Sequence, residues 1–233
     1  MIIKNIQKNK ETERLLLLDW DGTLLNNLAL QYVCVSKVFE RYSVATPTLE
    51  EYRREIDVDF MKFFYARGVP THITIEEVRK ILKETRHEYY NKKENPLRVA
   101  LREDAVSVLS RCRELGIKTA VISAETPEAL DRGLSQFNAK PLLDYYRGLA
   151  FQKDSAILET CALFNIQPAY TFYVDDLANG IESAKKTGVT VCGMMNNGHN
   201  APERILNAHP DFLVDSLTEV LEIIIHGELD KKS

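Results

Sequence analysis

Two carboxylates follow the most apolar segment of the chain. Residues 15–18 are four consecutive leucines, and Asp19, Asp21, Gly22 and Thr23 come directly after them. An Asp-Gly turn would explain the second acid and the glycine, but it would leave the first acid and the threonine without a role. Because side chains two residues apart on an extended chain point to the same side, both acids can face one pocket. Such a pair can supply a nucleophile, a general acid/base or ligands for a cation.

Further polar residues come after other apolar runs. Ser123 follows residues 119–122, and Asp175 and Asp176 follow residues 172–174. Two consecutive acids after a buried strand suggest a magnesium site, because this cation prefers hard oxygen ligands. The competing interpretation is structural. A serine at a strand end is often a turn or cap residue, and one acid of the pair could stabilise a helix amino terminus.

The elements that position these residues alternate along the chain. Short apolar runs at 15–18, 119–122, 172–174, 189–192 and 212–214 have the composition of strands buried on both faces. Helical patterns lie around and between them, at 103–115, 128–137, 155–164, 181–187 and 217–225. This alternation predicts an α/β fold with a doubly wound, Rossmann-like parallel sheet, which binds ligands at the carboxyl ends of its strands.

About 100 residues separate the first two predicted strands, far more than one crossover helix needs. Leu28, Tyr32, Val35, Phe39 and Tyr42 form an apolar helical stripe within this interval. We predict an all-helical domain at residues 27–96, inserted into a core domain made of residues 1–26 and 97–233. The expected linkers are residues 26–27 and 94–97.

Two capping boxes mark further helices in the insert. The pairs Thr48/Glu51 and Thr74/Glu77 each have the spacing that satisfies the first backbone amides of a helix. The first helix is expected to run to Gly68, past a cluster of aromatic residues. The second is expected to end before the next Asn-Pro dipeptide.

Composition and charge exclude several classes of protein. The 233 residues include 45% hydrophobic and 27% charged side chains, as in ordinary globular proteins. A net charge of -4 without a long basic run argues against a nucleic-acid partner. The four separated cysteines favour buried free thiols over a zinc site or disulfides, and the five histidines form no metal-ligand spacing. With neither a signal-peptide pattern nor a long apolar run, we expect a cytoplasmic protein with no membrane partner.

The stretch from Leu15 to Thr23 resembles the first motif of the haloacid dehalogenase superfamily, a hydrophobic strand followed by Asp-x-Asp-Gly-Thr. The resemblance implies that Asp19 is the nucleophile that accepts a phosphoryl group and that Asp21 is the general acid/base. An acid at the second position points to phosphate esters, because dehalogenating members lack it and phosphonate-cleaving members have alanine there. A helical insert after this motif is typical of the phosphoglycolate phosphatase-like and β-phosphoglucomutase-like group, in which it forms a mobile cap.

The same resemblance assigns the other site residues. Ser123 corresponds to the second motif and Lys153 to the third, so Lys153 is expected to be catalytic and to bind the substrate phosphate together with Thr23 and Ser123. The expected cofactor is Mg²⁺. Its expected protein ligands are Asp19, the backbone carbonyl of Asp21, and Asp176.

The chain departs from the family pattern at two places. Many relatives have Lys-Pro where Lys153 is followed by an aspartate, and the competing interpretation of this lysine is an ordinary surface residue. In the fourth motif, many relatives have Gly-Asp-Ser and then a second aspartate. The alignment places Asp175 at their glycine, Asp176 at their first aspartate and Gly180 at their second. That second acid is missing, so Asp175 remains an alternative metal ligand.

The expected function is that of a Mg²⁺-dependent phosphatase that hydrolyses a small phosphorylated metabolite through an aspartyl-phosphate, as a monomer or homodimer. The nearest alternative is a phosphosugar mutase of the β-phosphoglucomutase type, which would use the same residues. A non-catalytic phosphate-binding or regulatory module is an alternative of another class, suggested by the glycine at position 180. A receiver domain fits poorly, because its phosphoacceptor follows a middle strand in a much shorter chain. The sequence does not identify the substrate.

Overall fold

The centre of the computed structural model, which describes residues 13–56, 59–92, 94 and 96–226, is a parallel sheet of six strands. The strand order is β5-β4-β1-β6-β7-β8, and every neighbouring pair is parallel. The strands are β1 (Leu15–Leu18), β4 (Lys118–Ile122), β5 (Tyr145–Arg147), β6 (Thr171–Asp175), β7 (Thr190–Met194) and β8 (Phe212–Val214). This arrangement confirms the predicted α/β class and the parallel, doubly wound sheet.

Helices cover both faces of this sheet, which explains why β1 is apolar throughout. Leu16 and Leu18 pack with α5 (Ala105–Glu114), α6 (Pro127–Gln136) and α10 (Leu217–His226). Leu15 and Leu17 pack on the other face with α7 (Lys153–Phe164), α8 (Ala178–Lys185) and α9 (Pro202–Asn207). All four leucines are fully buried. A strand in the middle of a parallel sheet therefore has no polar face, and its first polar side chain comes where it ends.

The predicted strands match the observed ones to within two residues at each end. The sequence analysis missed β5, α9 and the two-residue strands β2 (Leu25–Asn26) and β3 (Ala100–Leu101), which pair antiparallel. β5 lies at the edge of the sheet and its residues are only partly buried, so it lacks the continuous apolar run of an inner strand. The other missed elements are too short for a periodic pattern to identify.

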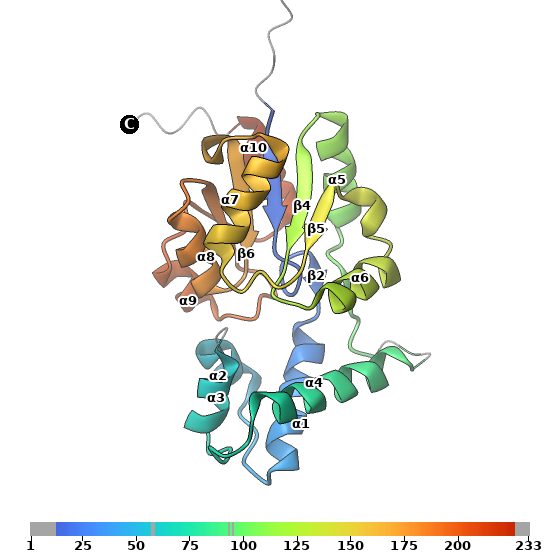
Figure 1. Cartoon of the computed structure of the whole chain (residues 1–233), viewed down its shortest axis with the longest axis vertical. Helices are drawn as coiled ribbons and strands as arrows, with labels where there is room; N and C mark the ends of the chain where they lie inside the picture. Colours follow the sequence, from blue (N-terminus) through green and yellow to red (C-terminus); the bar gives the residue numbers. More distant parts are fainter. Residues whose placement is uncertain (1–12, 57–58, 93, 95, 227–233) are drawn as a thin grey trace, which may run out of the picture.

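Four helices lie between β2 and β3: α1 (Leu28–Arg41), α2 (Leu49–Glu55), α3 (Phe60–Ala66) and α4 (Ile75–Tyr90). Figure 1 shows them grouped below the sheet, on the side toward which β1 points. Most of their buried side chains form one apolar cluster, built around Phe39, Phe63 and Phe64. Both predicted capping boxes are present, at the starts of α2 and α4.

One helix prediction was wrong. The segment expected to be a single helix up to Gly68 contains two, because α2 ends at Ile56 in an extended conformation and α3 begins after Asp59. The carbonyl of Ile56 accepts hydrogen bonds from Asn200 Nδ2, at 3.1 Å, and from Arg204. The carbonyl of Ile56, just after the end of α2, is thus bound by one side chain from the loop after β7 and one from α9.

Buried side chains elsewhere agree with the sequence-based expectations. All four cysteines are buried free thiols. Trp20, which lies between the two acids after β1, is also buried, with its ring centroid 6.4 Å from that of Phe137. Within the described ranges, no helix combines the length and the apolar character that crossing a membrane requires.

Candidate active site

The carboxylates predicted at two strand ends converge at one edge of the sheet. β1 and β6 are neighbours with Leu18 opposite Val174, and the amide of Asp19 donates to the carbonyl of Val174 at 3.0 Å. Asp19, Asp175 and Asp176 each offer a carboxylate oxygen, and these oxygens lie within 4.8 Å of one another. The parallel pairing of β1 with β6 therefore brings together acids that are more than 150 residues apart in sequence.

Burial and the nearby charge of Asp19 both disfavour the ionised forms of Asp175 and Asp176. Burial raises the pKa of Asp175 to about 8, with a further contribution from the charge of Asp19. Burial and Asp19 likewise raise the pKa of Asp176 to about 7. Both groups therefore resist ionisation in the absence of a cation. A hard divalent cation with oxygen ligands fits this donor set, because it would neutralise several carboxylates at once.

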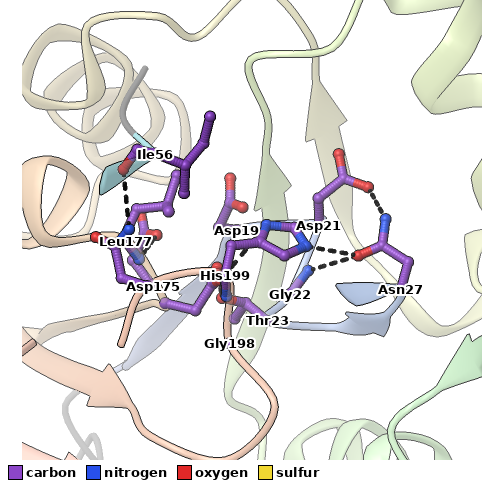
Figure 2. A network of polar contacts seen from close by, with 12 residues as sticks. Asp19, Asp21, Gly22, Thr23, Asn27, Ile56, Asp175, Leu177, Gly198 and His199 are labelled. Carbon is purple, nitrogen blue, oxygen red and sulfur yellow. Dashed lines mark hydrogen bonds and ion pairs between the residues drawn. The ribbon is translucent and has the colours of Figure 1, made fainter. Parts of the chain in front are cut away.

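The two acids after β6 are held by different partners. Asp175 accepts a hydrogen bond from the amide of Leu177 at 2.9 Å and another from the hydroxyl of Tyr173. Asp176 accepts from the hydroxyl of Thr23 at 3.1 Å and from the amide of His199 at 2.5 Å. Figure 2 labels Asp19, Thr23, Asp175, Leu177 and His199 among the residues of this polar network. Thr23, predicted to contact the substrate phosphate, thus directs its hydroxyl at Asp176.

Two glycines make room for these carboxylates. A Cβ atom at Gly22, where φ is +78°, would lie 2.2 Å from Asp176 Oδ2. A Cβ atom at Gly180 would lie 2.0 Å from Asp175 Oδ2. The carboxylate of Asp175 therefore occupies the space beside position 180, where the family pattern has an acid and this chain has glycine. This chain thus has a carboxylate from position 175 in the space beside position 180, where many relatives have an acid at position 180 itself.

Lys153 supplies a cation to the cluster from the first turn of α7. Its Nζ donates to Asp19 Oδ1 at 2.5 Å and to the carbonyl of Ile122 at 2.8 Å. Burial alone would lower the pKa of this lysine, but the charges of Asp19 and Asp175 outweigh that effect and raise it. The residue is 7% exposed, so the alternative of an ordinary surface lysine does not hold.

Asp21 lies in a separate environment from Asp19. Its Oδ1 accepts a hydrogen bond from Asn27 Nδ2 at 2.5 Å. The oxygen of the same amide accepts from the amide of Gly22 at 3.2 Å and lies 3.1 Å from His199 Nε2, as Figure 2 shows. Burial raises the pKa of Asp21 to about 7, and the negative charge of Glu125 adds to the effect. A carboxyl with such a pKa can both donate and accept a proton near neutral pH.

Ser123 lies at the end of β4 and is buried. Its Oγ accepts a hydrogen bond from the amide of Glu125 at 3.1 Å, in the loop that precedes α6. The helix predicted at 128–137 is α6, which begins one residue earlier with Thr126 as the N-cap and Pro127 in the first turn. The strand order β4-β1-β6 therefore puts Ser123 on one side of Asp19 and the acids 175 and 176 on the other.

Sequence analysis missed several residues that hold this site. Arg102 is buried and donates to the carbonyls of Thr23 and Gly22, each at 2.6 Å, and so fixes the turn after β1. His199 is buried, and burial lowers its pKa to about 4. Asn27, its partner, is 172 residues away in sequence. No spacing rule connects such positions, because the sheet topology alone brings them together.

Known proteins resemble this chain in sequence. It is 28% identical over 167 residues to the "Putative pyrophosphatase PpaX" of Caldanaerobacter subterraneus, covering 67% of this chain and 74% of that protein. It is 24% identical over 221 residues to the phosphoglycolate phosphatase of Vibrio parahaemolyticus, covering 91% of this chain and 96% of that one.

Solved structures resemble it in fold. A conserved haloacid dehalogenase-like protein of unknown function from Agrobacterium tumefaciens superposes with a TM-score of 0.74 at 18% identity, covering 93% of this chain and 99% of that one. The family model described as haloacid dehalogenase-like hydrolase matches residues 16–194, from β1 to the last residue of β7. Because that match spans well over half of the sequence, the chain belongs to the haloacid dehalogenase-like hydrolase family.

Proposed function

We propose that this hydrolase is a Mg²⁺-dependent phosphatase that acts on small phosphorylated metabolites through an aspartyl-phosphate intermediate. The observation that carries the proposal is the contrast between Asp19 and Asp21. Asp19 lies against Lys153 and two further carboxylates, whereas Asp21 lies outside that cluster with a pKa near neutrality. The names of the two sequence relatives, a phosphoglycolate phosphatase and a pyrophosphatase, support the same class of substrate.

In the proposed reaction, Asp19 is the nucleophile and Asp21 transfers the protons. An oxygen of Asp19 attacks phosphorus while the bond from phosphorus to the leaving oxygen breaks, and Asp21 gives its proton to that oxygen. Asp21, now ionised, takes a proton from water as the water oxygen attacks the aspartyl-phosphate. Inorganic phosphate leaves and Asp19 is regenerated. The hydrogen bond from Asn27 orients Asp21 for both proton transfers.

The remaining residues would neutralise the negative charge of the carboxylates and of the substrate phosphoryl group. Lys153 neutralises Asp19 and, with Ser123, contacts the phosphoryl oxygens of the substrate, while the hydroxyl of Thr23 holds Asp176 in place. Asp19, Asp176 and the backbone carbonyl of Asp21 would hold Mg²⁺, with Asp175 as the alternative to Asp176. When bound, the cation offsets the negative charge of the phosphoryl group and the carboxylates. The cluster of buried acids with raised pKa values supports this assignment.

We further propose that residues 27–96 form a cap domain over a core domain of residues 1–26 and 97–233. The position of α1–α4 at the carboxyl end of β1 supports this division (Figure 1). The antiparallel pair β2 and β3 lies where the chain enters and leaves the segment, which suits a pair of linkers. In this proposal the cap contacts the part of the substrate that is not phosphate.

The test is phosphate release from a panel of phosphomonoesters, with Mg²⁺ and with EDTA. Wild type should hydrolyse at least one substrate only with Mg²⁺, and Asp19→Asn should lower the rate by at least about 1,000-fold. Asp21→Asn should slow the reaction while a phosphorylated protein accumulates. Including a hexose phosphate and following its isomers separates a phosphatase from a mutase. An Asp19→Asn protein with near-native activity would contradict the covalent mechanism.

A further inference from the structure

An ion pair joins α4 of the helical segment to the loop that follows β4. Arg86 of α4 contacts Glu125, in the loop between β4 and α6, with 2.5 Å between Nη1 and Oε1. The two side chains are 26% and 23% exposed, so solvent reaches the pair only in part. The other terminal nitrogen of the guanidinium, Nη2, lies 3.5 Å from Gln31 Oε1 on α1.

The guanidinium has more donors than these partners use. Its Nε atom is buried and finds no hydrogen-bond acceptor among the described residues. Guanidinium has five N–H donors in a fixed plane, a geometry that matches two oxygens of a carboxylate or phosphoryl group. A buried donor without a partner is unfavourable, so native structures rarely keep one without a reason. The arginine therefore has capacity for an additional oxygen ligand.

The position of the Arg86–Glu125 pair indicates which part of a bound substrate would lie near it. Glu125 is two residues after Ser123 and donates its amide to the Ser123 hydroxyl. The charges of Glu125, Arg86 and Asp19 act on Asp21, and those of Asp19, Asp175 and Asp176 act on Lys153. In the proposed mechanism Lys153 contacts the phosphoryl group and Asp21 protonates the leaving oxygen. The leaving group of a bound substrate is therefore directed toward Arg86.

We propose that Arg86 is a specificity-determining residue that binds an anionic oxygen group, a carboxylate or a second phosphoryl group, on the leaving-group side of the substrate. Glu125 is its counter-ion until that group arrives. Being in a loop and partly exposed, the Glu125 side chain can turn to solvent and give up its place to a substrate oxygen. This inference rests on the proposed phosphatase function and adds the chemical class of the leaving group.

The test compares substrates that differ only in that group. 2-Phosphoglycolate carries a carboxylate two bonds from the ester oxygen, and 2-hydroxyethyl phosphate carries a neutral hydroxymethyl group in its place. Inorganic pyrophosphate presents a second phosphoryl group. The readout is kcat/KM for each anionic substrate divided by kcat/KM for 2-hydroxyethyl phosphate within one variant. Because Arg86 and Glu125 both affect Asp21, this ratio cancels any change in proton transfer that the three substrates share.

Wild type should favour at least one of the anionic substrates, and Arg86→Gln should reduce that preference about 10-fold or more through a higher KM. Glu125→Gln should increase the preference, because it removes the charge that competes for the arginine. Arg79→Gln, at an exposed position on the same helix, should leave the ratio unchanged. Which anionic substrate responds tells whether the recognised group is a carboxylate or a phosphoryl group. Melting curves show that each variant is folded, and Arg86→Lys is the substitute if the glutamine variant is not.

Two results would overturn the inference alone: an unchanged ratio in a folded Arg86 variant, or a Glu125→Gln variant that loses the anion preference as Arg86→Gln does. The second result would mean that the pair only joins the two parts of the molecule. If wild type hydrolyses none of the three substrates or any other phosphomonoester with Mg²⁺, the proposed function fails as well.

Discussion

The acidic cluster and the contact between α2 and the loop after β7 are held by different kinds of interaction. Asp19 and Asp175 come from β1 and β6, whose parallel pairing fixes their backbones in the middle of the sheet. The contact between α2 and residues 198–201 consists of a few hydrogen bonds. Arg53 donates to the carbonyls of Gly198 and Asn200, each at 3.1 Å, and its own carbonyl accepts from the amide of Ala201 at 2.9 Å.

In the proposed function, the acidic cluster carries out the reaction and the helical segment contacts the rest of the substrate. The two parts therefore differ in how easily they can move. Moving Asp19 relative to Asp175 would break backbone hydrogen bonds inside a buried sheet. Moving α2 relative to the loop would break only a few local hydrogen bonds, and most buried residues of α1–α4 pack among themselves. We therefore expect the cluster to stay rigid while the helical segment adjusts over it. The following experiments test that contrast.

The largest loss of stability is expected on substitution of Gly180, because the acidic cluster leaves no space for a side chain at that position. Gly180→Ala should lower the free energy of unfolding by about 2–3 kcal/mol, since its Cβ would overlap the buried carboxylate of Asp175. The measurement is urea unfolding at pH 7 without metal. The matched control is the same substitution in Asp175→Ala, where the overlapping atoms are gone and the cost should fall below about 1 kcal/mol. An equal cost in both backgrounds would show that Asp175 does not fill this space.

Magnesium should stabilise the cluster in a pH-dependent way. Asp175 and Asp176 have pKa values of about 8 and about 7 in the folded protein, above the ordinary value of 3.8. The folded state therefore binds more protons than the unfolded state between about pH 4 and 8, and the metal-free protein loses stability as the pH rises through that range. Mg²⁺ binds the ionised carboxylates, so its stabilising effect should be larger at pH 8 than at pH 5.

At pH 8, Mg²⁺ at about 100 times its dissociation constant should add about 2.7 kcal/mol. That corresponds to a rise in Tm of about 5–10 °C, measured by thermal melting with Mg²⁺ or EDTA. Asp176→Ala should remove most of the rise. If Asp175→Ala removes it and Asp176→Ala does not, the ligand assignment is off by one residue. A rise that is equal in wild type and both variants would mean that the cation binds elsewhere.

The smallest effect is expected at the contact between α2 and the loop. Arg53→Ala should lower the free energy of unfolding by about 1–2 kcal/mol, because it removes two charge-assisted hydrogen bonds to backbone carbonyls. It should also speed hydrogen exchange in residues 198–201 without affecting β1 and β6. Arg54→Ala is the control, because that neighbour is exposed and pairs only with exposed Glu50 among the described residues. Faster exchange throughout the sheet would mean that α2 and the sheet unfold as one unit.

Local patterns in the sequence were sufficient to predict much of the fold. The leucines of β1, which have no polar face, predicted both a central strand and the place where acids would emerge. The threonine–glutamate pairs predicted where α2 and α4 begin, because a capping box involves only neighbouring residues. The same local reasoning placed Asp19, Asp21 and Ser123 at the strand ends where they lie. Lys153 was assigned by resemblance alone and lay outside the helix predicted at 155–164, whereas it is the first residue of α7. Local reasoning joined α2 and α3 into one helix, since the contacts of Ile56 come from distant side chains.

The chain's sequence by itself thus determined most of the longer elements, their order and the chemistry available at strand ends. Only the tertiary structure decided which polar groups meet there. It placed the carboxylate of Asp175 in the space left by Gly180, and it brought Arg86 to Glu125 and Asn27 to His199. Periodicity and capping are properties of neighbouring residues, whereas these contacts depend on strand order and on how α1–α4 lie against the sheet. The physical reason is that side-chain packing and charge interactions act across space, independently of separation along the chain.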